Sequence, residues 1–348
     1  MQRPAVPACS RATRDPSRPA PRRVGAALAV ALTLASIWPT LSAAQAPAAR
    51  YPSKPIRLVN PFAPGGPVDV IGRAVSQELT KSWGQSIVVD NRPGAGTTIG
   101  AALVARATPD GYTLLVTSVS TAVSVSIYRN LPFDLARDFA PVALLAQTPL
   151  VLGVHTGTPV NSVRDLINLA IAKPGQIRYA SAGAGTISHL AVEYFRTVAK
   201  IDALIHVPYK GGAPAVAAVA SGEVQAAMDQ SIAIMPHARA GRLKAIAVSG
   251  AKRIDAAAEV PTFAESGLPG FEVIVWSAIF APAGTPPAIV GTLNAEINRI
   301  LLQPDIRERF QALGLSPASG SPAEFGTFLR SEIARWSRVS KEAGVKID

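Results

Sequence analysis

Short apolar segments that give way to glycine turns and then to helical patterns recur along this chain, and this alternation is its strongest constraint on folding. In the first half, the apolar segments predict strands at 56–60, 86–90 and 112–117. The helical patterns predict helices at 69–83 and 98–107, and glycine turns lie at 61–67, 91–96 and 109–111. Strands that alternate with helices in this way predict a parallel sheet covered by helices on both faces.

The second half begins the same alternation again. Strands are predicted at 150–155, 177–181, 204–207, 226–229 and 243–248. Helices are predicted to follow Ser162 and to occupy 186–199, 213–221 and 232–240. A second α/β unit of this size predicts a second lobe.

The last third has too few strands to form a lobe of its own. Residues 271–281 form one apolar stretch, residues 286–302 carry a helical apolar stripe, and a capping box opens a final helix at Ser321. We expect these helices to pack on the first lobe, with chain crossings at 145–151 and 271–281. The sequence therefore predicts lobe 1 at 47–148, lobe 2 at 149–272 and a return to lobe 1 at 273–348, with a hinged cleft between the lobes.

The N-terminus has the pattern of a secretory signal. Residues 1–23 hold six arginines and one acid, an uncharged apolar run follows at 24–38, and small residues precede Ala44 and Ala46. The alternative is a membrane anchor, but the run is shorter than the ~20 residues that span a bilayer. We expect residues 1–46 to be a signal peptide, cleaved near Ala44 or Ala46, and the mature chain to reside in the periplasm.

Charge and cysteine content narrow the classes of function. The chain has 34 basic and 23 acidic residues, and the expected leader contains six of the bases and one of the acids, so the mature charge falls from +11 to +6. The excess is scattered without a Lys/Arg block, which argues against nucleic acid and suits anionic solutes. The single cysteine, Cys9, lies in the expected leader, so no disulfide or cysteine metal site is expected.

The turn at 61–67 (PFAPGGP) is the first candidate site, because it joins a strand to a helix. In an open parallel sheet, ligands bind outside the carboxyl ends of the strands, where helix N-termini offer free N–H groups and a positive dipole end. Gly65 and Gly66 permit close approach of the backbone. This predicts an anion cradle. Asp69 has two readings that the sequence leaves open, ligand contact or helix cap.

The segment 181–189 (SAGAGTISH) repeats this device in the second half. Ser181 and Thr186 can donate hydroxyls, and the backbone from Gly183 to Thr186 can donate N–H groups. The string resembles a dinucleotide fingerprint but lacks its third glycine and ribose-binding acid, so no nucleotide cofactor is expected. His189 either faces the cleft or is structural.

Three further strand ends carry polar residues. Ser118 belongs to a hydroxyl run at 117–121, and Tyr209 follows the strand at 204–207. Asp229 ends a buried strand and either receives a ligand amine or hydroxyl or caps the next helix. The sequence holds no nucleophile elbow, zinc-protease motif or phosphate loop, and its four histidines lack metal-ligand spacing. No catalytic residue, metal or cofactor is therefore expected, although a triad assembled across the fold stays open.

Several segments together resemble a known family. They are YPSKPI at 51–56, PFAPGGPVD at 61–69, NRPGAG at 91–96, PDGYTL at 109–114, SAGAGT at 181–186, PYKGG at 208–212 and VPT at 260–262. In this order they are similar to the substrate-binding receptors of tripartite tricarboxylate transporters, the Bug family, over essentially the whole mature chain. Asn60 and Pro67 depart from the family pattern, which usually has an apolar residue and Ser or Thr there.

The resemblance implies a type II-like periplasmic binding protein fold, a monomer, and a transmembrane permease as partner. It also implies a small carboxylate, a di- or tricarboxylate, an aromatic acid or an acidic amino acid, held by the loops at 62–66 and 181–186. The residues expected at the ligand are Phe62, Ala63, Gly65, Gly66, Asp69, Ser118, Ser181, Ala182, Gly183, Thr186, His189, Tyr209 and Asp229. Two other hypotheses remain at this point: an exported hydrolase with Ser181 and His189 as nucleophile and base, and a ligand-sensing module for a membrane signalling protein.

Overall fold

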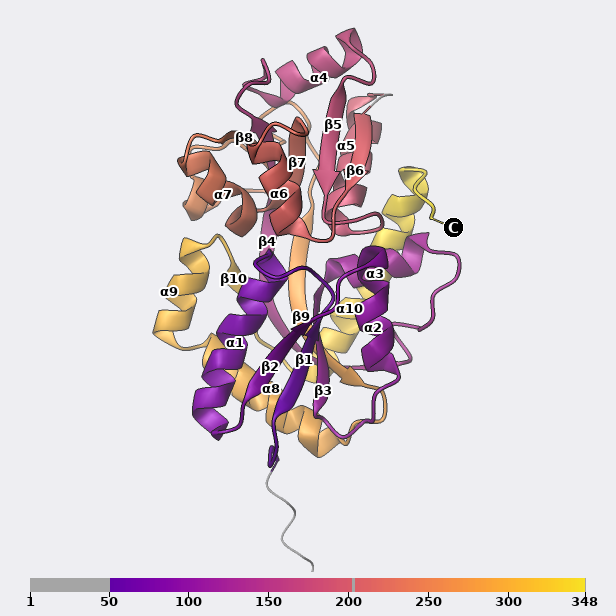
Figure 1. The fold of residues 1–348 in the computed structure, drawn as a ribbon, viewed down its shortest axis with the longest axis vertical. Coiled ribbons are helices and arrows are strands. Elements are labelled where there is room, and N and C mark those ends of the chain that lie inside the picture. The colour runs from indigo at the N-terminus through magenta and orange to yellow at the C-terminus, as the bar shows by residue number, and fades with distance from the viewer. Residues whose placement is uncertain (1–50, 202–203, 348) are drawn as a thin grey trace, which may run out of the picture. The chain divides into compact units, whose positions relative to one another are not determined.

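The computed structural model describes residues 51–201 and 204–347, and the predicted signal peptide lies outside them. Ten strands in this part of the chain form one mixed sheet, in the order β2-β1-β3-β9-β4-β7-β5-β6, with β8 and β10 paired to β4 (Figure 1). The strands are β1 (Ile56–Asn60), β2 (Ile87–Asn91), β3 (Thr113–Ser118), β4 (Phe139–His155), β5 (Ile177–Ser181), β6 (Leu204–Pro208), β7 (Ala226–Gln230), β8 (Leu243–Val248), β9 (Ile274–Pro282) and β10 (Ser316–Pro317).

The 17-residue strand β4 belongs to both halves of the sheet. Its first part pairs with β9 and β10, and its last part, from Leu150 to His155, pairs with β7 and β8. We call the half with β1, β2, β3, β9 and β10 the first lobe, and the half with β5 to β8 the second lobe. The two-lobed α/β fold predicted from the alternation is confirmed.

The strand directions refine this prediction. Parallel pairs occur between β1 and its neighbours β2 and β3, and between β5 and its neighbours β6 and β7. Every pair made by the long strands β4 and β9 is antiparallel. The predicted parallel pairing is thus found only where strands alternate with helices. Parallel neighbours need a crossover connection between them, and the helices supply it.

Helices cover both faces of the sheet. They are α1 (Pro67–Trp83), α2 (Thr98–Ala105), α3 (Val119–Ile127), α4 (Val163–Ala172), α5 (Ile187–Ala199), α6 (Gly212–Ala220), α7 (Ser231–Arg239), α8 (Pro287–Leu301), α9 (Pro304–Ala312) and α10 (Pro322–Glu342). One buried apolar cluster runs along one face through both lobes, whereas the other face has a separate cluster for each lobe. The shared cluster joins the lobes on one side of the sheet.

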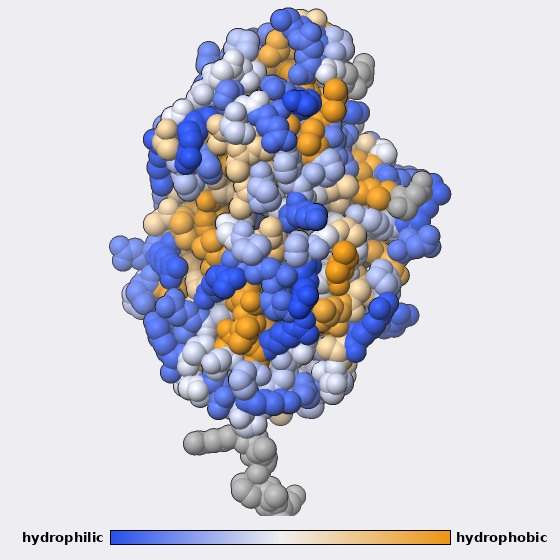
Figure 2. All heavy atoms as spheres, in the orientation of Figure 1, coloured by the Kyte–Doolittle hydropathy of each residue, from blue (hydrophilic) through white to orange (hydrophobic). Residues whose placement is uncertain are grey.

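In the part of the chain that the structure describes, no helix is both long and apolar enough to cross a membrane. On the face drawn in Figure 2, apolar residues lie in separate patches between polar ones. The large apolar side chains with high exposure, such as Val88 and Ile99, lie on different elements.

The final helix α10 is tied to the sheet by a buried carboxylate. Glu332 Oε2 accepts hydrogen bonds from Trp276 Nε1 on β9 and from Trp336 Nε1 on α10, both at 2.9 Å. The Glu332 side chain is also 3.6 Å from the Arg335 guanidinium. A buried indole N–H needs an acceptor, so one carboxylate satisfies two donors and fixes α10 against β9.

We predict that Glu332→Ala destabilises the protein by about 2–5 kcal/mol, because two buried indole N–H groups lose their acceptor. Glu332→Gln keeps a carbonyl oxygen at this place and should cost clearly less. Urea denaturation followed by tryptophan fluorescence measures both. Equal losses for the two variants would contradict the proposed role of the carboxylate.

Candidate functional site

A cavity of about 20 Å³ lies where the carboxyl ends of strands from both lobes meet. Residues from both lobes line it: Phe62, Gly66, Pro67, Val68, Ser118, Ser120, Ala182, Ile187, Ser188, Gly212, Asp229 and Gln230. A water needs roughly 10–15 Å³ of such space, so the closed cavity holds about one water molecule and the lobes must part to admit a larger ligand.

Most of these lining residues stand at the start of a helix. Gly66, Ser118 and Gln230 are the N-cap residues of α1, α3 and α7, and Ile187 and Gly212 are the first residues of α5 and α6. The first turn of a helix has N–H groups without intrahelical acceptors and carries the positive end of the helix dipole. Five helices therefore direct positive partial charge at one cavity.

Free donors are present on both sides of the cavity. Within the described residues, the backbone N–H groups of Val68, Ser188 and Gly212 donate to no protein acceptor. The hydroxyls of Ser118, Ser120 and Ser188 add polar groups, and the lining contains no Lys, Arg or His. An anion can thus be held here by backbone and hydroxyl donors alone.

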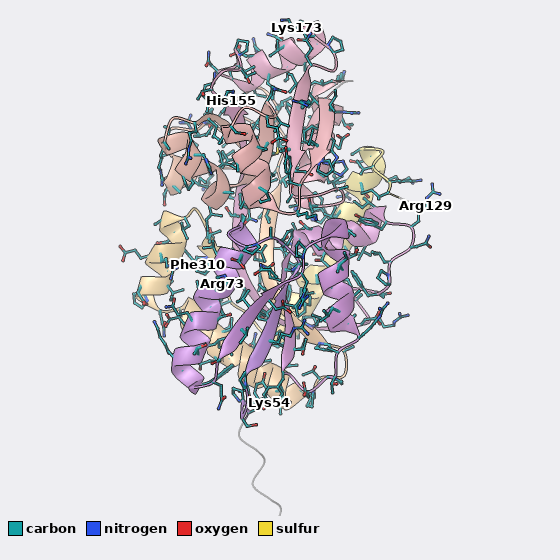
Figure 3. All side chains as sticks on the ribbon, viewed as in Figure 1. Lys54, Arg73, Arg129, His155, Lys173 and Phe310 are labelled. Carbon is teal, nitrogen blue, oxygen red and sulfur yellow. The ribbon has the colours of Figure 1, made fainter. Side chains whose placement is uncertain are left out.

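The loop before α1 is fixed by Asp69. Its carboxylate accepts from Gly65 N–H at 3.0 Å, Arg73 Nε at 2.8 Å, Asn91 Nδ2 at 2.9 Å and Asn60 Nδ2 at 3.3 Å. Burial acts to raise the pKa of Asp69, but the hydrogen bonds and charge of these partners outweigh it and hold the pKa below its usual value. Asp69 does not line the cavity; it shapes the loop, and Figure 3 labels Arg73 on the same helix.

The loop before α5 is fixed by its own hydroxyls. Ser181 Oγ accepts from Gly183 N–H at 3.1 Å, Thr186 Oγ1 donates to the Gly183 carbonyl at 2.7 Å, and Ser188 Oγ accepts from Ala182 N–H at 2.8 Å. These bonds leave Ala182 and Ser188 at the cavity, while Ser181 and Thr186 lie beneath it.

A stack of three rings supports this second loop from below. The ring centroids of His189 and His206 are 4.0 Å apart, and those of His206 and Tyr179 are 4.9 Å apart. His206 Nε2 is 2.6 Å from Ser181 Oγ, and His189 Nδ1 accepts from Gly185 N–H at 3.2 Å. Burial lowers the pKa of both His189 and His206 to about 4, so the two imidazoles are neutral at physiological pH.

The structure divides the residues expected at the ligand into three groups. The residues that line the cavity are Phe62, Gly66, Ser118, Ala182 and Asp229. Gly183 and Tyr209 line an adjoining space nearer the surface, which shares Phe62 and Ala182 with the cavity. The residues that shape loops or join the lobes instead are Ala63, Gly65, Asp69, Ser181, Thr186 and His189.

Seven lining residues were not named individually among the expected contacts, although several lie in the predicted segments: Pro67, Val68, Ser120, Ile187, Ser188, Gly212 and Gln230. Each lies in the first turn of a helix or at its cap, within a predicted glycine turn or a few residues after a predicted turn or strand. The sequence thus predicted where each turn lies. It did not predict which residues of the turn face the cavity, because that depends on the rotation of the helix about its axis.

Hydrogen bonds across the cleft hold the lobes together in this structure. Ala63 N–H donates to the Lys210 carbonyl at 3.0 Å, Tyr128 Oη donates to the Ala184 carbonyl at 3.0 Å, and Ile187 N–H donates to Ser120 Oγ at 3.1 Å. The structure therefore represents a closed arrangement, in which the cavity is completed by both lobes.

A second hollow is lined by His155, Lys173 and neighbouring residues. Figure 3 shows both labelled residues in the second lobe, at its end away from the first lobe. Among the described residues, no group of three or more His, Cys, Asp or Glu side chains is placed to hold a metal ion. The cavity between the lobes is thus the best-supported site.

Two lobes that close on a cavity of this kind define a periplasmic solute-binding protein. The family model described as "Tripartite tricarboxylate transporter family receptor" matches residues 71–345. The chain belongs to this family. Protein BugT of Bordetella pertussis is a relative that is 38% identical over 309 residues, covering 88% of this chain and 94% of BugT.

Solved structures agree with this assignment. The structure of R. palustris Rpa4515 with adipate matches with a TM-score of 0.83 and 36% identity, covering 85% of this chain and 99% of that chain. The structure of MatC from Rhodopseudomonas palustris with bound malate matches with a TM-score of 0.80 and 35% identity, covering 83% and 99%. The resemblance to the Bug receptors found in the sequence is confirmed.

The buried histidines generate a prediction on pH and stability. The unfolded chain takes up their protons near the ordinary pKa of 6.5, whereas the native state does so only near 4. Folding stability should therefore fall as the pH is lowered from 6.5 toward 4, by up to about 1.4 kcal/mol per pH unit for each imidazole.

Chemical denaturation across this pH range tests the prediction on the wild type and on the double variant His189→Asn, His206→Asn. The variant should show a flatter profile. Asp229, whose raised pKa gives the opposite slope, is present in both proteins and cancels in the comparison. Parallel profiles would show that the histidines do not titrate as proposed.

Proposed function

We propose that this chain is a periplasmic receptor that captures a small carboxylate by closure of its lobes and delivers it to the membrane permease of a tripartite tricarboxylate-type transporter. The observation that carries the proposal is the convergence of five helix N-termini on a cavity without basic side chains. Such a site favours a compact anion and binds it through preformed dipoles.

The comparisons support a carboxylate as the ligand. Adipate and malate are named in the titles of two matching structures, and both are small dicarboxylates. The cleft supports capture by closure, because donors such as Val68 and Gly212 come from different lobes. A ligand that contacts both lobes gains contacts on closure and so favours the closed state.

The remaining parts of the proposal concern the chain as a whole. We propose export by the signal peptide at 1–46, action as a monomer, and relative motion of 149–272 against 47–148 with 273–348. We also propose binding without catalysis. Ser181 and His206 form a serine–histidine contact, but the serine is 0% exposed and its hydroxyl is held beneath the cavity.

Isothermal titration calorimetry of the mature protein against di- and tricarboxylates, aromatic acids and acidic amino acids tests the proposed function. We expect at least one small aliphatic acid to bind one-to-one, because the donors are preformed and the cavity is small. Absence of binding across this panel, or turnover of ester substrates that Ser181→Ala abolishes, would contradict the proposal.

Closure can be tested separately through two glycines of similar backbone conformation. Gly96 has φ +57, and a Cβ there would collide with the Ala184 carbonyl oxygen of the other lobe and with the Tyr128 ring of its own lobe; Gly84 has φ +66 and open space. Alanine costs about 1–2 kcal/mol of backbone strain at either position, but only at Gly96 does it also hold the lobes apart.

We therefore expect Gly96→Ala to weaken binding of the acid found by calorimetry by tenfold or more and to remove the ligand-induced decrease in the radius of gyration measured by X-ray scattering. Gly84→Ala should keep both properties, with a loss of stability limited to the backbone strain. If the two variants bind alike, contact between Gly96 and Ala184 is not part of closure.

A further inference from the structure

Asp229 is the only ionisable residue among those that line the cavity. It lies near the end of β7, is 5% exposed, and faces the start of α6. A Cβ on Gly212 would be 2.7 Å from Asp229 Oδ2 and 3.2 Å from Pro67 Cδ of the first lobe. The free carboxylate oxygen therefore points to the place where the two lobes meet.

The two oxygens of this carboxylate differ in their surroundings. Oδ1 accepts from Gln230 N–H at 2.7 Å, whereas Oδ2 accepts no hydrogen bond from any described residue. Asp229 lines the cavity, so Oδ2 is open to a donor from a bound ligand or from solvent.

No cation of the described chain compensates Asp229. The ionisable residues on the elements packed against β7 are His155 of β4, Arg178 and Tyr179 of β5, His189, Glu193, Tyr194 and Arg196 of α5, and His237 and Arg239 of α7, while α6 has none. None of them forms an ion pair or a side-chain hydrogen bond with Asp229. Burial raises the pKa of Asp229 to about 6, and the Gln230 N–H lowers it only in part.

Capture of an anion beside this carboxylate meets a like-charge conflict. Two neighbouring carboxylates in a buried site repel each other, and one of them tends to hold a proton. The helix N-termini favour the anionic ligand but do not supply a donor to Oδ2. A proton must therefore lie between Asp229 and the ligand. It comes either from a donor group of the ligand or from solvent.

We propose, on the basis of the carboxylate-binding function above, that Asp229 determines ligand selectivity by requiring a donor at Oδ2. An acid that carries a hydroxyl or ammonium group beside its carboxylate supplies this donor itself and binds without proton uptake. An acid without such a group binds only when Asp229 takes up one proton from solvent. Asp229 thus distinguishes hydroxy and amino acids from plain dicarboxylates of the same length.

The test is titration calorimetry at pH 6.5, 7.5 and 8.5 with the matched pairs succinate and malate, and glutarate and glutamate. Repeating each titration in buffers of different ionisation enthalpy counts the protons taken up. For the plain acid we expect affinity to fall about tenfold per pH unit, with uptake approaching one proton. For the acid with the donor we expect level affinity and uptake near zero.

Asp229→Asn removes the charge while keeping shape and hydrogen-bonding capacity, so plain acids should bind it with no dependence on pH. Asp255→Asn, at an exposed aspartate in the second lobe, is the matched control and should behave as the wild type. Thermal melting verifies that both variants are folded.

The outcomes separate this inference from the function on which it rests. No binding of any acid to the wild type or to Asp229→Asn contradicts the proposed function itself. Binding with the same pH profile for both members of a pair, or a pH dependence that persists in Asp229→Asn, overturns the role of Asp229 and leaves the receptor function standing.

Discussion

The direction of the strands toward the cleft is the constraint on which the site depends. In the first lobe β1 and β3 end at Asn60 and Ser118, and in the second lobe β5 and β7 end at Ser181 and Gln230. Each of these strands leads into a helix, so the helices must begin where the lobes meet. The anion-binding character of the cavity follows from chain direction, because helix N-termini need no charged side chain to attract an anion.

The contact between lobes imposes a second requirement on the backbone. Where the loops approach each other, a side chain would collide with the opposite lobe: a Cβ on Gly185 would lie 2.5 Å from the Tyr128 ring, and one on Gly211 3.1 Å from Ala63 N. Both glycines also have positive φ. Glycine at these positions therefore serves the closed state as well as the local turn.

The alternation of strands and helices was predictable because its signals are local. Apolar periodicity located most strands and helices of both lobes, but not α9 or the first part of β4, and the capping box at Ser321 and Glu324 is present at the start of α10. Helix α3 was not predicted, because its valines, threonine and isoleucine are β-branched and favour strands. The N-cap of helix α3 is Ser118, whose side chain accepts a hydrogen bond from Ser120 N–H. The helix packs against α10, and this contact between distant segments cannot be read from sequence periodicity.

The site was predictable only in part, because it depends on contacts between segments that are distant in the sequence. The alternative hydrolase hypothesis paired Ser181 with His189, but in the structure Ser181 Oγ contacts His206. Parallel pairing of β5 with β6 sets Tyr179 opposite His206, and this register brings the imidazole under the second loop. Asp69 was left between two roles in the sequence, and its four donors in the structure assign it to the shape of the first loop.

The two departures from the family pattern can be understood from this arrangement. Asn60 donates to Asp69 and accepts from Phe62 N–H, so it strengthens the first loop. Pro67, at the first position of α1, has no N–H and removes one donor from the first lobe. The donors that remain are neutral groups that bind any carboxylate, so discrimination among acids must come from lining side chains. Of these only Asp229 carries a charge, and a charge without a partner is the strongest source of discrimination that a cavity of this size contains.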